Sequence, residues 1–260
     1  MLSTTASYRL LASDITKSLD RTASAPQVKR DSAYFLANIT KVKSIDDFLG
    51  NTRLFTYAMK AFGLGDMTYA KAFMRKALEG GVDAKDSFAN SLSDKRYQDF
   101  VTTLNFARYG ETTTVFSRTQ QGTVDNYVRQ TLEENAGTQN EGVRLALYFQ
   151  RKASGITGAF DILADPALLK VVQTALSIPA ATGAMDIDKQ AALITAKLDL
   201  DDFKDAKLLD KFLNRFTSLY ELQNSSAATS PSVMLISGPT EAGIGQDLLL
   251  SLQNLKLGGS

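Results

Sequence analysis

The side chains available for chemistry in this sequence are carboxylates, lysines, arginines, hydroxyls and tyrosines, because it contains no histidine and no cysteine. Those two absences exclude zinc sites with the usual Cys and His ligands, thiolate nucleophiles and every His-dependent catalytic triad. Adjacent carboxylates occur at Asp46-Asp47, at Glu133-Glu134 and in the run 199–202. On a helix, neighbouring side chains point about 100° apart, so such pairs rarely converge on one substrate. We therefore predict a non-enzymatic protein and assign no catalytic residue.

Two other motifs resemble ligand sites but lack the residues that the chemistry needs. The run 199–202 (DLDD) has neither the alternating acidic spacing nor the distal glutamate of a calcium-binding loop. The stretch 237–245 (SGPTEAGIG) lacks the Gly-Lys-Ser/Thr ending of a phosphate-binding loop. Asp165 and Asp205 stand directly before apolar helical patterns, where a carboxylate caps free backbone N–H groups. We expect no metal and no cofactor.

The composition is that of a globular protein, with 44% hydrophobic and 22% charged residues in a chain of 260. There are 29 Lys and Arg residues against 28 Asp and Glu. Nucleic-acid binding favours a clear excess of basic residues, so we expect no nucleic-acid partner. The sequence contains no run of about 18 apolar residues, so we expect no membrane insertion. The first twenty residues lack the apolar core and cleavage site of a secretory signal. We expect a protein that is either cytoplasmic or exported without a cleaved signal.

Helical periodicity dominates the chain. Val124, Tyr127 and Val128, followed by Thr131 and Leu132, share one face of a helix that we expect to end near Gly137. Thr138 and Glu141 have the spacing of a capping box, which predicts that the next helix begins there. Asp165-Pro166 predicts another helix start, since the carboxylate caps and proline loses no hydrogen bond at the first position.

Polar residues near these helices have predicted structural roles. The segment 63–66 (GLGD) follows an apolar helix and indicates a helix end with a turn. Arg144 and Arg151 lie close to the aromatic pair Tyr148-Phe149, and we expect internal ion pairs with Glu133 or Glu141.

Four segments share one pattern, in which Asp or Asn precedes an apolar helical stripe. They are residues 51–64, 94–106, 165–178 and 205–217. Residues 34–64 also align without gaps on 148–178, with Tyr34 matching Tyr148 and Leu54 matching Leu168. The other two segments, 94–106 and 205–217, are separated along the chain by nearly the same number of residues as 34–64 and 148–178. We interpret the chain as two diverged copies of one helical unit, although capped amphipathic helices in general also look alike.

Both ends of the sequence carry an apolar stripe at coiled-coil-like spacing. The N-terminal stripe contains Tyr8, Leu11, Ile15 and Leu19, and the C-terminal stripe contains Ile244, Leu248, Leu252 and Leu255. Each segment is too short to be a stable helix alone in water, so each must dock on the protein's own core or on a neighbouring subunit. We assign these residues, from Leu11 onward, as the candidate partner contacts.

The predicted fold is mainly α: a multi-helix bundle built from two diverged repeats, with amphipathic N- and C-terminal helices. The expected organisation is an N-terminal helical segment (1–33), repeat 1 (34–122), repeat 2 (123–224), a Ser/Ala/Thr-rich linker (225–240) and a C-terminal amphipathic helix (241–260).

Three stretches of the sequence resemble a known family. They are 123–176, which begins TVDNYVRQTLEENAG and ends DPALLKVVQTAL, 67–82 (MTYAKAFMRKALEGGV) and DKRYQDFVTTLNF in 94–106. They resemble an uncharacterised bacterial domain-of-unknown-function family encoded in flagellar gene clusters of alphaproteobacteria. The resemblance implies a helical protein with a link to flagella. It supplies no activity and no catalytic residues.

The resemblance and the stripes together suggest a function. Flagellar axial subunits leave the cell without a cleaved signal, usually lack cysteine, and pair their two ends as apolar helices, although they usually carry β-rich outer domains. We expect a non-enzymatic, flagellum-associated structural or assembly protein that binds flagellar components or itself through helix–helix contacts. The alternative is a cytoplasmic regulator or export chaperone of flagellar components, which would bind a client helix between the two repeats.

Overall fold

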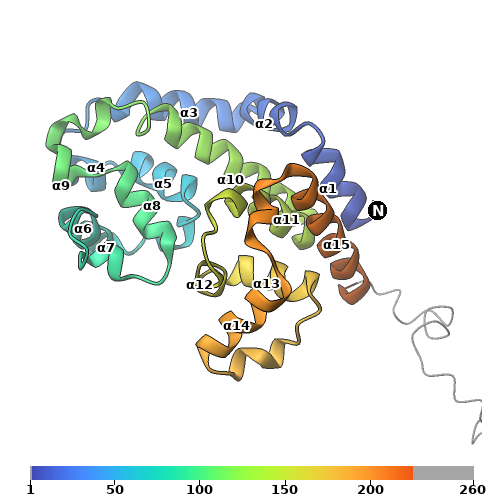
Figure 1. Ribbon diagram of the computed structural model, residues 1–260. Coiled ribbons are helices and arrows are strands. Elements are labelled where there is room, and N and C mark those ends of the chain that lie inside the picture. The colour runs from blue at the N-terminus through green and yellow to red at the C-terminus, as the bar shows by residue number, and fades with distance from the viewer. Residues whose placement is uncertain (1, 225–260) are drawn as a thin grey trace, which may run out of the picture. The chain divides into compact units, whose positions relative to one another are not determined.

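The computed structural model describes residues 2–224, in which α-helices alternate with short 3-10 turns and no β-strand occurs (Figure 1). The mainly α fold is thus confirmed. Residues Met1–Glu221 form one compact unit and Leu222–Ser260 a second, of which the structure describes only the final turn of the last helix. The predicted linker, the glycine stretch 237–245 and the C-terminal stripe lie outside the described residues.

The helices follow one another with short connections. The first nine are α1 (Thr4–Ala12), α2 (Ile15–Ser24), α3 (Pro26–Ile39), α4 (Ile45–Gly50), α5 (Thr52–Ala61), α6 (Lys71–Gly80), α7 (Phe88–Ser91), α8 (Lys95–Thr103) and α9 (Phe106–Tyr109). After the 3-10 helix Gly110–Val115 come α10 (Gln121–Gln139), α11 (Glu141–Lys152), α12 (Ala159–Ala164), α13 (Pro166–Ala175), α14 (Ile187–Lys197) and α15 (Ala206–Asn224).

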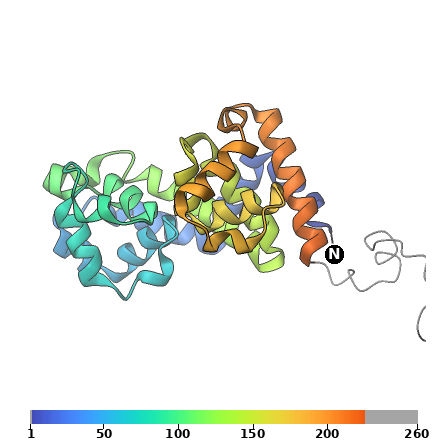
Figure 2. The same ribbon diagram turned by 60° about the horizontal axis from the view of Figure 1, so that its bottom comes forward.

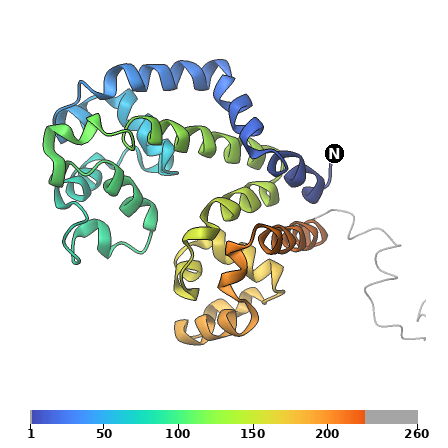
Figure 3. The ribbon, with the colours of Figure 1, turned by 45° about the horizontal axis from the view of Figure 1, so that its top comes forward.

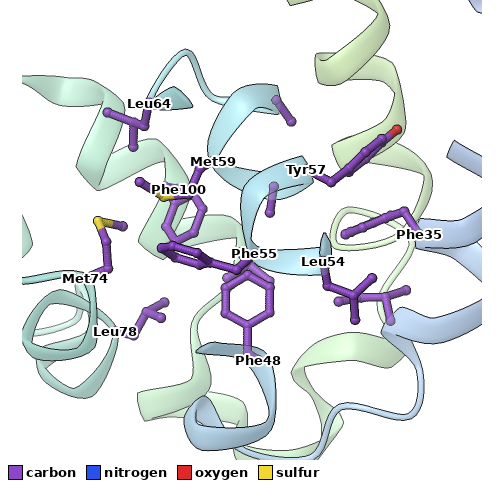
Figure 4. Close-up of a cluster of buried hydrophobic side chains, with 14 of the residues drawn as sticks. Phe35, Phe48, Leu54, Phe55, Tyr57, Met59, Leu64, Met74, Leu78 and Phe100 are labelled. Atoms are coloured by element: carbon purple, nitrogen blue, oxygen red, sulfur yellow. The ribbon is translucent and has the colours of Figure 1, made fainter. Parts of the chain in front are cut away.

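The buried apolar side chains form two clusters. The first cluster runs from Val28 to Val128 and is centred on Phe48, whose ring lies 5.8 Å from Phe55 and 6.3 Å from Phe100 (Figure 4). The second cluster contains Tyr8 and residues from Leu132 to Phe216. Figures 2 and 3 show the two groups of helices that enclose these clusters, blue to green for the first and yellow to orange for the second.

Helix α10 contributes to both clusters. Its first half gives Val124, Tyr127 and Val128 to the first cluster, and Tyr127 stacks on Tyr57 with ring centroids 4.0 Å apart. Further along, Leu132 belongs to the second cluster. The periodicity predicted this helix, which continues two residues past Gly137. The predicted repeat boundary at residue 123 lies near its start, whereas the change of cluster occurs in its middle.

The predicted helix caps are present at all four shared segments. The side chains of Asn51, Asp94, Asp165 and Asp205 each accept hydrogen bonds from backbone N–H groups of the helix that follows. The segment 63–66 ends α5 as expected, with Gly63 at φ +71°.

The predicted capping box at Thr138 and Glu141 is wrong. Helix α10 continues through Thr138, whose hydroxyl donates to the carbonyl of Asn135. Asn140 is the single residue between the helices, and its side chain caps α11 by accepting from the N–H groups of Gly142 and Val143. Because the break falls at Asn140, its amide takes the role that the spacing assigned to the threonine.

The aligned segments have matching local structure. Helices α4 and α12 both have six residues, α5 and α13 both have ten, and each pair begins at positions 114 residues apart. The carboxylates of Asp47 and Asp161 accept from the backbone N–H groups of the two residues that precede each helix. After the second helix of each pair, the chain turns at Gly63 and at Ser177, both with positive φ.

The turn at Ser177 predicts a stabilising substitution. Ser177 is a non-glycine residue at φ +52°, a conformation that costs an L-residue about 1–2 kcal/mol. After subtracting the larger unfolded-state entropy of glycine, Ser177→Gly should raise the free energy of unfolding by about 0.5–1 kcal/mol in urea titrations. Gly63→Ala should lower it, and Gly155→Ala, which meets no atom within 4 Å, serves as control. A loss of stability in Ser177→Gly would contradict this account.

Candidate protein-interaction site around the first helix

The N-terminal stripe is divided between two helices. Helix α1 ends before Ser13, and Asp14 caps α2 by accepting from the N–H of Lys17 at 3.0 Å. Leu11 and Ile15 are half-buried against the second cluster, and Leu19 packs against both clusters. In this structure the stripe therefore contacts the protein's own core. Ile244, Leu248, Leu252 and Leu255 lie outside the described residues, so the two stripes are not compared.

Helix α1 lies antiparallel to α15 (Figures 1 and 2). The backbone N–H of Thr4 donates to a carboxylate oxygen of Glu221 at 2.7 Å, and Nε of Arg9 donates to Oδ1 of Asn214 at 2.7 Å. Between them, the hydroxyl of Thr5 lies 3.0 Å from that of Thr217 and 3.3 Å from that of Ser218. The polar side chains of α1 thus face its neighbour.

The start of α11 lies beneath this pair of helices. Nδ2 of Asn140 donates to the hydroxyl of Thr4 at 2.9 Å, so the residue that caps α11 also binds α1. A Cβ atom added to Gly142 would lie 2.5 Å from Tyr220 and 2.8 Å from the methyl group of Thr4. Glycine is therefore required at the point where α1, α11 and α15 meet. We call the residues that contact α1 here the α1-binding surface: Asn140, Gly142, Asn214, Thr217, Ser218 and Glu221.

Tyr8 is the one large apolar side chain of α1 that is fully buried. It is 1% exposed and belongs to the second cluster, and its hydroxyl has no hydrogen-bond partner. Burial, with a smaller contribution from Asp210, raises the pKa of this hydroxyl well above its usual range. The phenol stays neutral, and its unpaired hydroxyl weakens the attachment of α1.

The opposite face of α1 is apolar and exposed. Leu2 and Leu10 are 63% and 66% exposed, and Ala6 between them is exposed as well. Ala6 and Leu10 lie four residues apart on one face of α1, and Leu2 lies in the segment that precedes the helix. Leu10 thus faces solvent, whereas Tyr8 and Leu11 of the same helix face the second cluster. An exposed apolar face of this kind is a candidate contact with another protein.

A second polar assembly lies where α10 crosses α11. The carboxylate of Glu133, whose side chain is 2% exposed, accepts two 2.7 Å hydrogen bonds from Arg151. Burial opposes the charge of Arg151, but the hydrogen bonds and attraction of Glu133 outweigh it and raise the Arg151 pKa. Arg144 pairs with Glu141, so both predicted ion pairs are confirmed.

Further polar contacts extend from this ion pair to neighbouring helices. The hydroxyl of Tyr148 donates to Asp165 at 2.5 Å, and burial followed by this bond raises the Tyr148 pKa. The ammonium group of Lys152 binds Asp99 of α8 at 2.7 Å. Each donor in this assembly already has an acceptor within the protein. The assembly joins α8, α10 and α11 to the residue that caps α13.

The carboxylates considered as candidate acids lie apart from one another. Asp46 binds Arg75 at 2.5 Å, Glu133 binds Arg151, and Asp201 binds Lys204 at 2.6 Å. Within residues 2–224, no three acidic side chains gather into a group that could hold a metal ion. No helix in the same range is both long and apolar enough to cross a bilayer.

The geometry defines an all-α protein whose first helix is bound between later helices. Residues 61–209 match the family described as "Protein of unknown function (DUF1217)", and the chain belongs to this family. The crystal structure of protein AGR_C_984 from Agrobacterium tumefaciens is similar, with 48% sequence identity and a TM-score of 0.79. The similarity covers 84% of this chain and 93% of that one. No curated protein matches.

Neither the α1-binding surface nor the polar residues of α1 that contact it could be recognised from the sequence pattern. Thr4, Thr5 and Arg9 carry no periodic apolar signal, because they bind through hydrogen bonds. Gly142 is a glycine at the second position of an otherwise apolar-faced helix, and this is the one local sign of a close approach.

The close approach at Gly142 predicts a steric effect. Gly142→Ala should lower the free energy of unfolding by about 1–3 kcal/mol, because the new methyl group displaces Tyr220 or Thr4. Gly158→Ala is a suitable control, since its added Cβ would meet nothing within 4 Å. Hydrogen exchange should also show faster exchange in α1 of Gly142→Ala. Equal stability of the two variants would contradict a close approach of α1 and α15 to Gly142.

The Glu133–Arg151 ion pair predicts that substitutions of its two residues have non-additive effects on the free energy of unfolding. Arg151→Met leaves a buried carboxylate without its partner and should cost about 3–5 kcal/mol of unfolding free energy. Adding Glu133→Gln should recover part of that loss in guanidinium titrations. Lys204→Met, which breaks an exposed pair, should leave stability unchanged. Purely additive losses would argue against a coupled pair.

Proposed function

We propose that this protein is a non-enzymatic, flagellum-associated structural or assembly protein that binds other proteins through helix–helix contacts. The observation that carries the proposal is the exposed apolar surface at the start of the chain, formed by Ala6 and Leu10 of α1 and by Leu2 just before the helix. Burying such leucines in an interface contributes roughly 1.5–3 kcal/mol each. The flagellar context rests on the sequence resemblance described above.

The terminal residues of the chain supply a second candidate contact. The stripe of Ile244, Leu248, Leu252 and Leu255 has the spacing of a helix that packs on a partner helix. Leu11, Ile15 and Leu19 are half-buried in this structure, so their contact with a partner would require a rearrangement of α1 and α2. A neutral net charge is compatible with close self-association.

We also infer that the two clusters are diverged copies of one helical unit. The matched lengths of α4 with α12 and α5 with α13, the matched carboxylates Asp47 and Asp161, and the matched turns support this origin. Such a duplication would give the protein two related helical surfaces on which to assemble partners.

Cell fractionation tests the location that the proposal requires. An epitope-tagged protein is followed in bacteria with and without a working flagellar export gate. Gate-dependent appearance outside the cytoplasm, or in basal bodies, is the expected result. Retention in the cytoplasm in both strains would overturn the exterior role and favour a regulator or export chaperone of flagellar components.

Variants of the two candidate contacts test the mechanism. Leu10→Ser and deletion of residues 240–260 should each reduce swimming motility and recovery of a tagged partner. Val115→Ser is the matched control, because Val115 is 53% exposed on a different element. Wild-type motility and partner recovery in both variants would contradict binding through these surfaces.

A further inference from the structure

Helix α1 is attached both by polar contacts and by apolar packing: Leu11 and Ala12 pack against the second cluster, in which Tyr8 is buried. Its bonds to α15 are formed by Thr5 and Arg9 at partly exposed positions, where water can replace each partner. Its one fully buried large side chain, Tyr8, has an unpaired hydroxyl. These contacts specify a position for α1, and the same helix of a second copy would make all of them again, including the burial of Tyr8.

The connection between α1 and α2 needs one change to become a helix. Ser13 already has helical angles, with φ −59° and ψ −31°, whereas Asp14 has φ −140° and ψ 76°. If Asp14 became helical, α1 and α2 would form one continuous helix from Thr4 to Ser24. Such a helix would be about 30 Å long, at 1.5 Å per residue.

The continuous helix would restore the stripe that the sequence contains. Tyr8, Leu11, Ile15 and Leu19 fall at spacings of three, four and four, which align on one face only if the helix is unbroken. The same change would carry α1 away from its own α15. The α1-binding surface would then be vacant, and an identical helix from another copy would fit it with identical contacts.

We propose that α1 exchanges between two copies of this protein, by straightening at Asp14 and binding to the α1-binding surface of the second copy. The proposal rests on the proposed function, because it gives the helix–helix assembly a specific partner and a specific surface. It differs from binding through the exposed apolar surface of Leu2 and Leu10, which leaves α1 in place.

The absence of cysteine from the chain permits a direct test. Thr5→Cys and Ser218→Cys place thiols where hydroxyls now lie 3.3 Å apart, close enough for a disulfide after small side-chain adjustments. The double variant should form an intrachain disulfide in the monomer, which also shows that it folds. The two single variants are then mixed in equal amounts and oxidised at high protein concentration.

Exchange predicts a disulfide-linked dimer in that mixture. Peptide mapping should show that the thiol introduced at position 5 of one copy is joined to the thiol introduced at position 218 of the other. Thr5→Cys mixed with Val115→Cys measures random collision, and exchange should exceed it at least tenfold. An intrachain disulfide in the double variant together with collision-level cross-linking in the mixture would overturn the proposal.

Substitutions at the hinge make the test specific to straightening. Asp14→Ala and Asp14→Gly both remove the cap of α2, but only alanine favours a continuous helix. Placed in the Thr5→Cys and Ser218→Cys backgrounds, Asp14→Ala should give several times more linked dimer than Asp14→Gly. Equal yields would refute straightening as the route.

The cross-linking, motility and fractionation results together distinguish failure of α1 exchange from failure of the proposed flagellar role. Loss of motility in Leu10→Ser without cross-protomer linkage would retain the assembly role and reject exchange. Efficient linkage in a protein that remains cytoplasmic in both strains would retain exchange and reject the exterior flagellar role.

Discussion

The passage of one helix through two separate apolar clusters is the constraint on which the rest of the structure depends. Helix α10 must present Tyr127 to the first cluster and, a turn later, Leu132 to the second. The stacking of Tyr127 on Tyr57 joins it to one side, and the Glu133–Arg151 pair joins it to α11 on the other. Because a buried carboxylate needs its partner, α11 can lie along α10 in few ways, which limits where α12 to α15 can pack.

Apolar and polar contacts make different contributions to this fold. The clusters around Phe48 and Phe149 supply the burial that stabilises the fold, whereas α1 is located by hydroxyls, an amide and a carboxylate. Hydrogen bonds depend strongly on geometry, so they fix the register of α1 against α15. They add little net stability where water competes. The burial of Tyr8 in the second cluster adds an apolar contribution to the same attachment.

Sequence patterns predicted the parts of the fold that depend on local chemistry. The caps at Asn51, Asp94, Asp165 and Asp205 and the extent of α10 follow from side chains that bind their own helix. The break at Asp14 was missed because the apolar spacing across it is helical, and tertiary packing overrides it. The α1-binding surface could not be predicted, since Thr5 and Ser218 are ordinary surface residues until two distant helices meet.

The distance along the chain between α1 and its binding surface has a consequence for biosynthesis. Thr5 and Thr217 are separated by 212 residues, so the surface that binds α1 is incomplete until α15 has been made. At about 5–20 residues per second, a ribosome needs roughly 10–40 s to complete that interval. During this time α1 exists without α15, and α11 is the part of its binding surface that is made first. The attachment of α1 is therefore completed only at the end of synthesis of the described residues.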